Sequence, residues 1–132
     1  MKVAVFGASG FVGINVVNAL EKAGINVIAS DIRESPYLAG EFIRADLLDY
    51  GQVEHVVKGS DIVVHLAASP LPVSIEKPRM NARINIEGSL NIMDAAREHN
   101  VEKIIFSSAS SLIGKVQYNP VDEKHPAIPK TP

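Results

Sequence analysis

The sequence contains no cysteine, no long apolar segment and no marked excess of charge of one sign. Without cysteine, a disulfide scaffold, a thiolate nucleophile and a cysteine-ligated zinc site are all excluded. No apolar stretch approaches the roughly 20 residues that a membrane-spanning helix requires. The first apolar run meets a glycine cluster too early to form a secretory signal. These absences predict a soluble, cytoplasmic protein.

Charge is nearly balanced along the chain. Thirteen basic and fifteen acidic side chains leave a formal net charge of −2 at pH 7. Such a balance offers no electrostatic field for holding nucleic acid or an anionic membrane. The four histidines show no metal-ligand spacing. We therefore expect no nucleic-acid partner, no membrane partner and no metal site.

What is present is an alternation of apolar runs with segments of helical period. The length of 132 residues and the 46% hydrophobic content are typical of one globular domain. Strands are expected at residues 3–6, 26–30, 41–45, 61–67 and 103–106, and helices at 11–23, 49–57 and 77–99. The strands lack polar alternation, which is typical of strands buried on both faces. The pattern predicts an α/β fold with a doubly wound parallel sheet of about five strands and helices on both faces.

A glycine-rich segment, Gly7-Ala8-Ser9-Gly10-Phe11-Val12-Gly13, joins the first predicted strand to the first predicted helix. Glycines at such a junction allow a tight turn, close approach of the backbone to a pyrophosphate, and contact of helix with strand. The positive end of the helix dipole also favours a diphosphate there. The segment predicts a dinucleotide site on a Rossmann-like sheet.

An acid at the end of the second predicted strand bears on the choice of dinucleotide. Asp31 stands 18 residues past Gly13. An acid near that distance accepts hydrogen bonds from an adenosine ribose and repels a 2′-phosphate. NAD is therefore favoured over NADP, although Arg33 leaves a 2′-phosphate open as the alternative.

Two further strand ends are candidates for the same ligand. Asp46 and Leu47 follow the third predicted strand, where they can meet the adenine; the alternative is that Asp46 or Asp49 only caps the next helix. Leu66-Ala67-Ala68 closes the fourth strand with small residues, which let the backbone come close to a flat ligand.

Together these motifs resemble the extended short-chain dehydrogenase/reductases, in the NAD-dependent epimerase/dehydratase branch that works on nucleotide sugars, and within it the UDP-glucose 4-epimerase-like group. The matching segments are Gly7–Gly13, Asp31, Asp46-Leu47, His65-Leu66-Ala67-Ala68, Asn85-Ile86-Glu87-Gly88-Ser89, Phe106–Ser111 and Asp122-Glu123.

The resemblance implies a role for each candidate residue in holding NAD. The residues implied at the pyrophosphate are Gly7, Ser9, Gly10, Phe11, Val12 and Gly13. Those implied at the adenosine are Asp31, Ile32, Arg33, Asp46 and Leu47. Those implied along the cofactor towards the nicotinamide are Leu66, Ala67 and Ala68, with Asn85 as a structural or cofactor-adjacent amide, or else only an exposed helix residue.

The family's proton-transfer pair, Tyr-x-x-x-Lys, does not occur in this sequence. Tyr37, Tyr50 and Tyr118 are each followed four residues later by an acid. In the family the tyrosine comes directly after a stretch like residues 126–132. The resemblance therefore implies that residues 1–114 are an NAD-binding domain, and that 115–132 are a proline-rich loop leading to a missing C-terminal part. We expect dinucleotide binding with little or no turnover.

The sequence also lacks a hydroxyl residue at the position where the family has its catalytic Ser or Thr. Counting back from Gly114 puts Ala109 at that place, with Ser108 and Ser110 on either side. A small shift of register would restore a hydroxyl; the alternative is that these serines only form hydrogen bonds at the strand end.

Two other functions remain open. The chain can be a non-catalytic dinucleotide-binding or redox-sensing module, which the missing Tyr/Lys pair favours. It can also be an intact reductase with a preference for NADP, which Arg33 favours. A parallel sheet without its last strands also exposes an unpaired edge, so the possible partners include a second copy of the chain.

Overall fold

A computed structural model describes residues 1–130, and it contains one parallel sheet of five strands. The strands are β1 (Lys2–Phe6), β2 (Asn26–Asp31), β3 (Glu41–Arg44), β4 (Ile62–His65) and β5 (Lys103–Phe106). Their order is β3-β2-β1-β4-β5, with every neighbouring pair parallel. The order runs outward in both directions from β1. It therefore opens a crevice at the carboxyl ends of β1 and β4, where sheets of this kind bind ligands.

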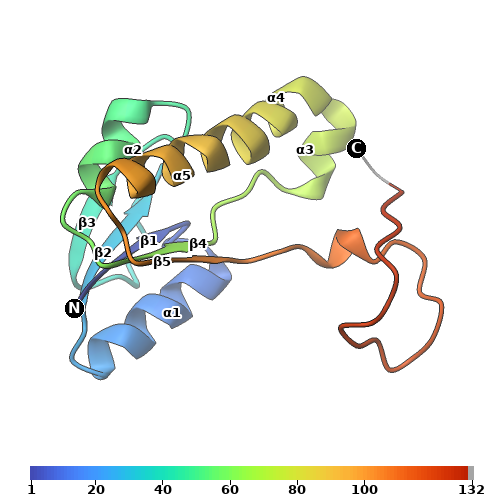
Figure 1. Cartoon of the computed structure of the whole chain (residues 1–132), viewed down its shortest axis with the longest axis horizontal. Helices are drawn as coiled ribbons and strands as arrows, with labels where there is room; N and C mark the ends of the chain where they lie inside the picture. Colours follow the sequence, from blue (N-terminus) through green and yellow to red (C-terminus); the bar gives the residue numbers. More distant parts are fainter. Residues whose placement is uncertain (131–132) are drawn as a thin grey trace.

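Helices cover both faces of the sheet, as the sequence predicted. The helix α1 (Phe11–Lys22) lies on one face, and α2 (Tyr50–Val57) and α5 (Gly88–Glu98) lie on the other (Figure 1). Asp49 caps α2 by accepting a hydrogen bond from the Gln52 backbone N–H at 3.1 Å.

The expected helix over 77–99 is present but is not a uniform α-helix. It consists of α4 (Pro78–Ala82), a π-helical turn η1 (Arg83–Glu87) and α5 in direct succession. A short helix, α3 (Leu71–Glu76), precedes it and was not expected; Pro70 is its N-cap and a second proline lies in its first turn. Proline is tolerated in a first helical turn, where its missing N–H would have no helical partner.

Two apolar clusters form the core, one on each face of the sheet. Alternate residues of β1 divide between them: Val3 and Val5 pack towards α1, and Ala4 and Phe6 pack towards α2 and α5. All four are at most 2% exposed. This division is the physical reason that the strand has no polar alternation.

The edge strand β5 departs from that pattern. All four of its residues are exposed, and Phe106 retains 55% of its accessible surface. Within residues 1–130 no strand pairs with its outer side. After β5 the chain extends away from the sheet (Figure 1), and between residues 107 and 130 its one helical segment is the 3₁₀ turn η2 (Ser110–Leu112).

Residues 115–130 form no helix or strand. The expected domain boundary at residue 114 stays a prediction, and the last two residues of the expected loop lie outside the described range. Over that same range, no helix combines the length and the apolar character needed to cross a membrane.

Candidate functional site

The glycine-rich turn after β1 packs directly against the segment that follows β4. Gly7 has a φ of +79°, in the left-handed region, and a Cβ added there would lie 2.5 Å from the Ala67 backbone nitrogen. A Cβ on Gly13 would collide with the Gly7 carbonyl oxygen. Glycine is therefore required at both positions for close approach of backbone to backbone. We call residues 66–70, the segment that Gly7 touches, the strap.

The start of α1 is open towards the crevice. Gly10 is the N-cap residue, and no side chain caps the helix in the described part of the chain. The first backbone N–H groups of a helix have no partner within it, and the helix dipole makes this end positive. The position after β1 is thus suited to an anionic group.

Asp31 lies at the end of β2 beside the glycine-rich turn. Its Oδ2 accepts a hydrogen bond from the Ser9 backbone N–H at 3.1 Å, and its Oδ1 accepts one from Ile32 N–H at 2.7 Å. The Ser9 hydroxyl in turn donates to the Arg33 carbonyl at 2.6 Å. These bonds fix the carboxylate while leaving further lone pairs for donors from a ligand. The Arg33 side chain is exposed.

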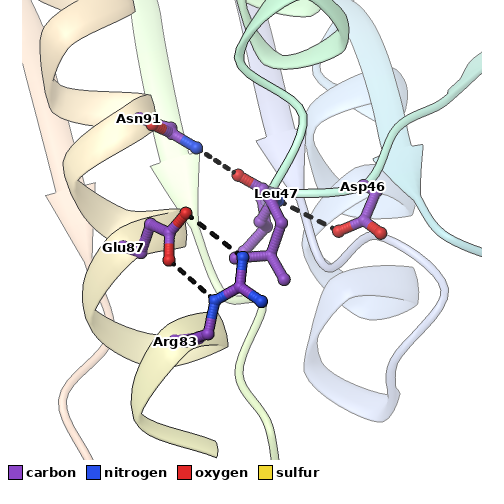
Figure 2. Close-up of polar contacts among 6 residues, drawn as sticks. Asp46, Leu47, Arg83, Glu87 and Asn91 are labelled. Carbon is purple, nitrogen blue, oxygen red and sulfur yellow. Dashed lines mark hydrogen bonds and ion pairs between the residues drawn. The ribbon is translucent and has the colours of Figure 1, made fainter. Parts of the chain in front are cut away.

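The segment after β3 is held in place by its own hydrogen bonds. Asp49, and not Asp46, is the N-cap residue of α2. The Asp46 Oδ1 instead accepts a hydrogen bond from the Leu48 N–H at 3.0 Å. Asn91 on α5 donates to the Leu47 carbonyl at 2.7 Å (Figure 2). The neighbouring Arg83–Glu87 ion pair spans 3.0 Å, and Arg83 lowers the pKa of Glu87.

These segments surround two cavities that share one wall. The first, of about 410 Å³, extends from Asp31 past Leu47 to the strap, and the second, of about 470 Å³, lies between the strap and the segment after β5. Leu66, Ala67 and Ala68 line both. A long ligand lying across the strap would therefore contact both cavities.

Most of the residues singled out from the sequence lie at these cavities. The first is lined, among others, by Gly7, Gly10, Asp31, Ile32, Asp46, Leu47, Leu66, Ala67 and Ala68. Asn85 and Ser108 line the second. The remaining candidates line neither cavity: Ser9, Phe11, Val12, Gly13, Arg33 and Ser110.

Several lining residues were missed in the sequence. Ser30, Met80 and Ile84 line the first cavity, and Ser89, Ser111 and Pro129 line the second. Ser111 belongs to the same serine run after β5 as Ser108. The sequence therefore identified the run, but it did not identify which of its serines line the cavity. Met80 and Ile84 carried no such signal, because apolar side chains on a helix fit an ordinary core.

Two tyrosines, Tyr50 and Tyr118, are poorly suited to accept a proton near neutral pH. The Tyr50 hydroxyl donates to Glu98 at 2.5 Å, which raises the pKa of Tyr50 to about 12. Tyr118 donates to Asp122 at 2.6 Å, and this bond raises the pKa of Tyr118 as well. A tyrosine base requires the opposite shift. Among residues 1–130, no cluster of three or more His, Asp or Glu side chains could hold a metal ion.

The model of the NAD dependent epimerase/dehydratase family matches residues 3–132. The chain belongs to this family. The match covers the glycine-rich turn, Asp31, the strap and the helix that carries Asn85, so it includes every part of the site described above.

Similar proteins include UDP-glucose 4-epimerases. The enzyme of Mus musculus is 30% identical over 146 residues, covering 95% of this chain and 42% of the relative. The crystal structure of the Thermus thermophilus UDP-glucose 4-epimerase in complex with NAD matches 99% of this chain and 45% of its own, with a TM-score of 0.89 and 31% identity. The Thermotoga maritima enzyme with UDP-glucose gives a TM-score of 0.90 and 29% identity, over 99% and 46% of the two chains. The chain thus spans less than half the length of these relatives.

Proposed function

We propose that this chain is the NAD-binding portion of an enzyme that acts on a nucleotide sugar, as an epimerase or dehydratase. The observation that supports the proposal best is the strap, which forms a wall common to two cavities and is touched by the glycine-rich turn. An elongated ligand with an anionic centre, a sugar hydroxyl near Asp31 and a flat far end fits this arrangement. A dinucleotide has these groups: a pyrophosphate at its centre, ribose hydroxyls and a flat ring at its end.

We assign each part of the family's cofactor to one segment of the site. In the proposal, the pyrophosphate is bound at the start of α1 by Gly7, Ser9, Gly10, Phe11, Val12 and Gly13. The adenosine is bound by Asp31, Ile32, Arg33, Asp46 and Leu47. The part of the cofactor towards the nicotinamide lies along Leu66, Ala67 and Ala68, with Asn85 behind them.

The choice of NAD over NADP follows from the charge beside the ribose. The Asp31 carboxylate is anchored by two backbone N–H groups, so it cannot swing away from an added phosphate without losing both hydrogen bonds. A 2′-phosphate would therefore meet a fixed negative charge at short range. The Arg33 side chain is exposed and carries no hydrogen bond in the described structure, so it supports the NADP alternative only weakly.

Bound NAD supplies a hydride acceptor for a carbon of the sugar. The chain's own contribution is to bind and orient that cofactor and to hold a hydroxyl near the reacting oxygen, for which Ser108 and Ser110 are the candidates. Ser108 lines the second cavity, which favours it over Ser110. The proton-transfer pair is absent from the sequence, and the pKa values of Tyr50 and Tyr118 are raised. We therefore propose that the 132-residue chain turns over little, and that a longer parent protein binds the nucleotide sugar.

The second candidate function is a non-catalytic dinucleotide-binding or redox-sensing module. The raised pKa values of Tyr50 and Tyr118 favour it, because they make these two tyrosines poor bases near neutral pH. The intact mass of the protein from its native source separates the two. A heavier chain that continues into Tyr-x-x-x-Lys supports the enzyme, and a mass matching 132 residues supports the module. Fractionation of the source cells would test the cytoplasmic location, which stays a prediction.

Isothermal titration with NAD and NADP tests the binding proposal directly. We expect the wild-type chain to bind NAD at least tenfold more tightly than NADP. Asp31→Asn removes the charge but keeps the side-chain shape, so it should weaken NAD binding and narrow the preference. Asp94→Asn on the exposed surface of α5 changes the net charge equally and should leave both affinities unchanged. Failure of the wild-type chain to bind NAD would overturn the proposal.

A further inference from the structure

The helix over residues 78–98 carries a polar row that faces the strap and β4. Asn81, Asn85 and Ser89 follow one another at intervals of four residues. In a uniform α-helix, eight residues rotate about 80° beyond two full turns at 3.6 residues per turn, which would carry Ser89 away from the direction of Asn81. The π-helical turn over Arg83–Glu87 lies between them. Its i→i+5 pattern rotates less per residue and returns Ser89 towards that direction.

The two asparagines hold the strap through the Ser69 peptide. Asn85 Oδ1 accepts a hydrogen bond from Ser69 N–H at 2.7 Å, and its Nδ2 donates to the Ser69 carbonyl at 3.2 Å. Asn81 Nδ2 donates to the same carbonyl at 3.0 Å and to that of Pro70 at 3.3 Å. The two amides are also bonded to each other at 3.0 Å. Both hydrogens of Asn85 Nδ2 are used in these bonds, so its amide is directed at the chain's own backbone.

Ser89 connects this arrangement to the buried histidine of β4. The Ser89 hydroxyl donates to the Asn85 backbone carbonyl at 2.6 Å, which uses its single hydrogen. Its 2.8 Å bond to His65 Nε2 must then be one in which the imidazole donates. His65 is 2% exposed and carries the proton on Nε2, and its bare Nδ1 has no partner among the described residues. The tautomer of His65 is thus set by the carbonyl inside the π-helical turn.

We propose that His65, Ser89, Asn85 and Asn81, here called the polar ladder, position the strap for dinucleotide binding, with His65 and Ser89 acting through the π-helical turn. His65 and Ser89 are positioning residues in this scheme, because their hydrogen bonds go to the turn that aims Asn85. The inference rests on the proposed function only in that the strap is taken to contact NAD. The ladder itself is a property of the chain without ligand.

The ligand-free chain provides the first test. Nitrogen-15 NMR should show the neutral Nε2–H tautomer for His65, and the Ser69 amide should exchange slowly with solvent. Ser89→Ala removes the acceptor for His65 and the donor to Asn85, so Ser69 exchange should accelerate at least tenfold. Ser89→Thr keeps a hydroxyl that can reach the i−4 carbonyl and should restore protection. An Nδ1–H tautomer, or unchanged Ser69 exchange in Ser89→Ala, would overturn the ladder.

NAD titration of the same variants tests the link to binding. We expect Ser89→Ala to weaken NAD binding five- to twentyfold and Ser89→Thr to bind like the wild type. Val53→Ala, in the buried face of α2, lowers stability without touching the ladder and should leave the affinity unchanged. Equal affinity of Ser89→Ala and wild type would overturn the positioning role. A wild-type chain that fails to bind NAD would instead overturn the proposed function, while the tautomer and exchange results would still decide the ladder.

Discussion

Backbone conformation limits the site at the scale of single residues. Gly7 combines a positive φ with contact to the strap, and Asp31 is held by backbone N–H groups. Both features depend on backbone geometry, so even conservative changes at these positions should have large effects on the site. The chain also offers a control for Gly7, because Gly59 has a φ of +75° with nothing near its missing Cβ.

Gly7→Ala should nearly abolish NAD binding, whereas Gly59→Ala should preserve it. Both changes place a Cβ in the left-handed region, at a cost of roughly 1–2 kcal/mol in the free energy of unfolding. Only at Gly7 does the new methyl group also meet the Ala67 backbone and displace the strap. Thermal unfolding and NAD titration of the two variants separate strain from contact. Equal affinities in both would show that the contact with the strap does not matter.

Burial of His65 makes stability depend on pH. Burial lowers the pKa of this imidazole below its ordinary value of about 6.5. As pH falls below about 6.5, the unfolded state takes up the proton before the folded state does, so this group removes stability on the acid side. Above that value both states are neutral and the effect vanishes.

Comparison of the wild type with His65→Gln isolates the contribution of His65 protonation to the free energy of unfolding. Glutamine can still donate to Ser89 but does not titrate. The difference in unfolding free energy between the two chains should be constant above pH 7 and should move in favour of the variant as pH is lowered towards 5. Parallel denaturant-derived stability curves across this range would contradict the assignment.

At the scale of elements, α5 packs closely against the site. A Cβ on Gly88 would lie 2.7 Å from the Leu47 Cβ, so the helix approaches the segment after β3 at a position where only glycine fits. The Asn91 bond to the Leu47 carbonyl holds the same contact one turn later (Figure 2). The packing of α5 therefore decides where Leu47 stands in the first cavity.

Gly88→Ala should lower stability by about 1–3 kcal/mol through overpacking, and it should weaken NAD binding through the displaced Leu47. Gly51→Ala is the matched change in α2, where a new Cβ meets only ordinary contact with Asp49 at 3.5 Å. That variant should gain up to about 1 kcal/mol, because alanine favours the helix over glycine. Denaturant unfolding measures the change in unfolding free energy of each variant. Destabilisation by both variants would refute the packing argument.

At the scale of the whole molecule, the open edge at β5 is the main departure from a closed domain. Ile105 and Phe106 keep 50% and 55% of their surface exposed on a strand whose outer side pairs with no strand in residues 1–130. Exposed apolar edge strands promote pairing between chains. We propose that the 132-residue chain associates with itself through β5.

Sedimentation velocity over a range of concentrations should show reversible association of the chain. Ile105→Lys places a charge on the exposed edge and should shift the distribution towards monomer. Lys58→Ala, on the surface beyond α2, is the control and should leave the distribution unchanged. A wild-type monomer at the highest concentration would rule out this association.

Much of the fold could be predicted because its signals are local. The apolar runs at 3–6, 26–30 and 103–106 form strands, and the glycine-rich turn opens a helix, as expected. The family resemblance was confirmed by the match over residues 3–132. The roles of the individual site residues stay predictions.

What the sequence by itself determined is the set of elements and the glycine and acid that mark the crevice, because hydrophobic period and backbone freedom act between near neighbours. Only the tertiary structure decided three things: that Asp46 is not a helix cap, that Asn85 binds the Ser69 peptide, and that Ser108 rather than Ser110 lines a cavity. The tertiary structure also decided how the π-helical turn is connected to β4. Ser89 donates to the Asn85 carbonyl in that turn and is bonded to His65, which lies 24 residues away in the sequence. Such contacts join segments far apart in the chain, and no local pattern records which segments will meet.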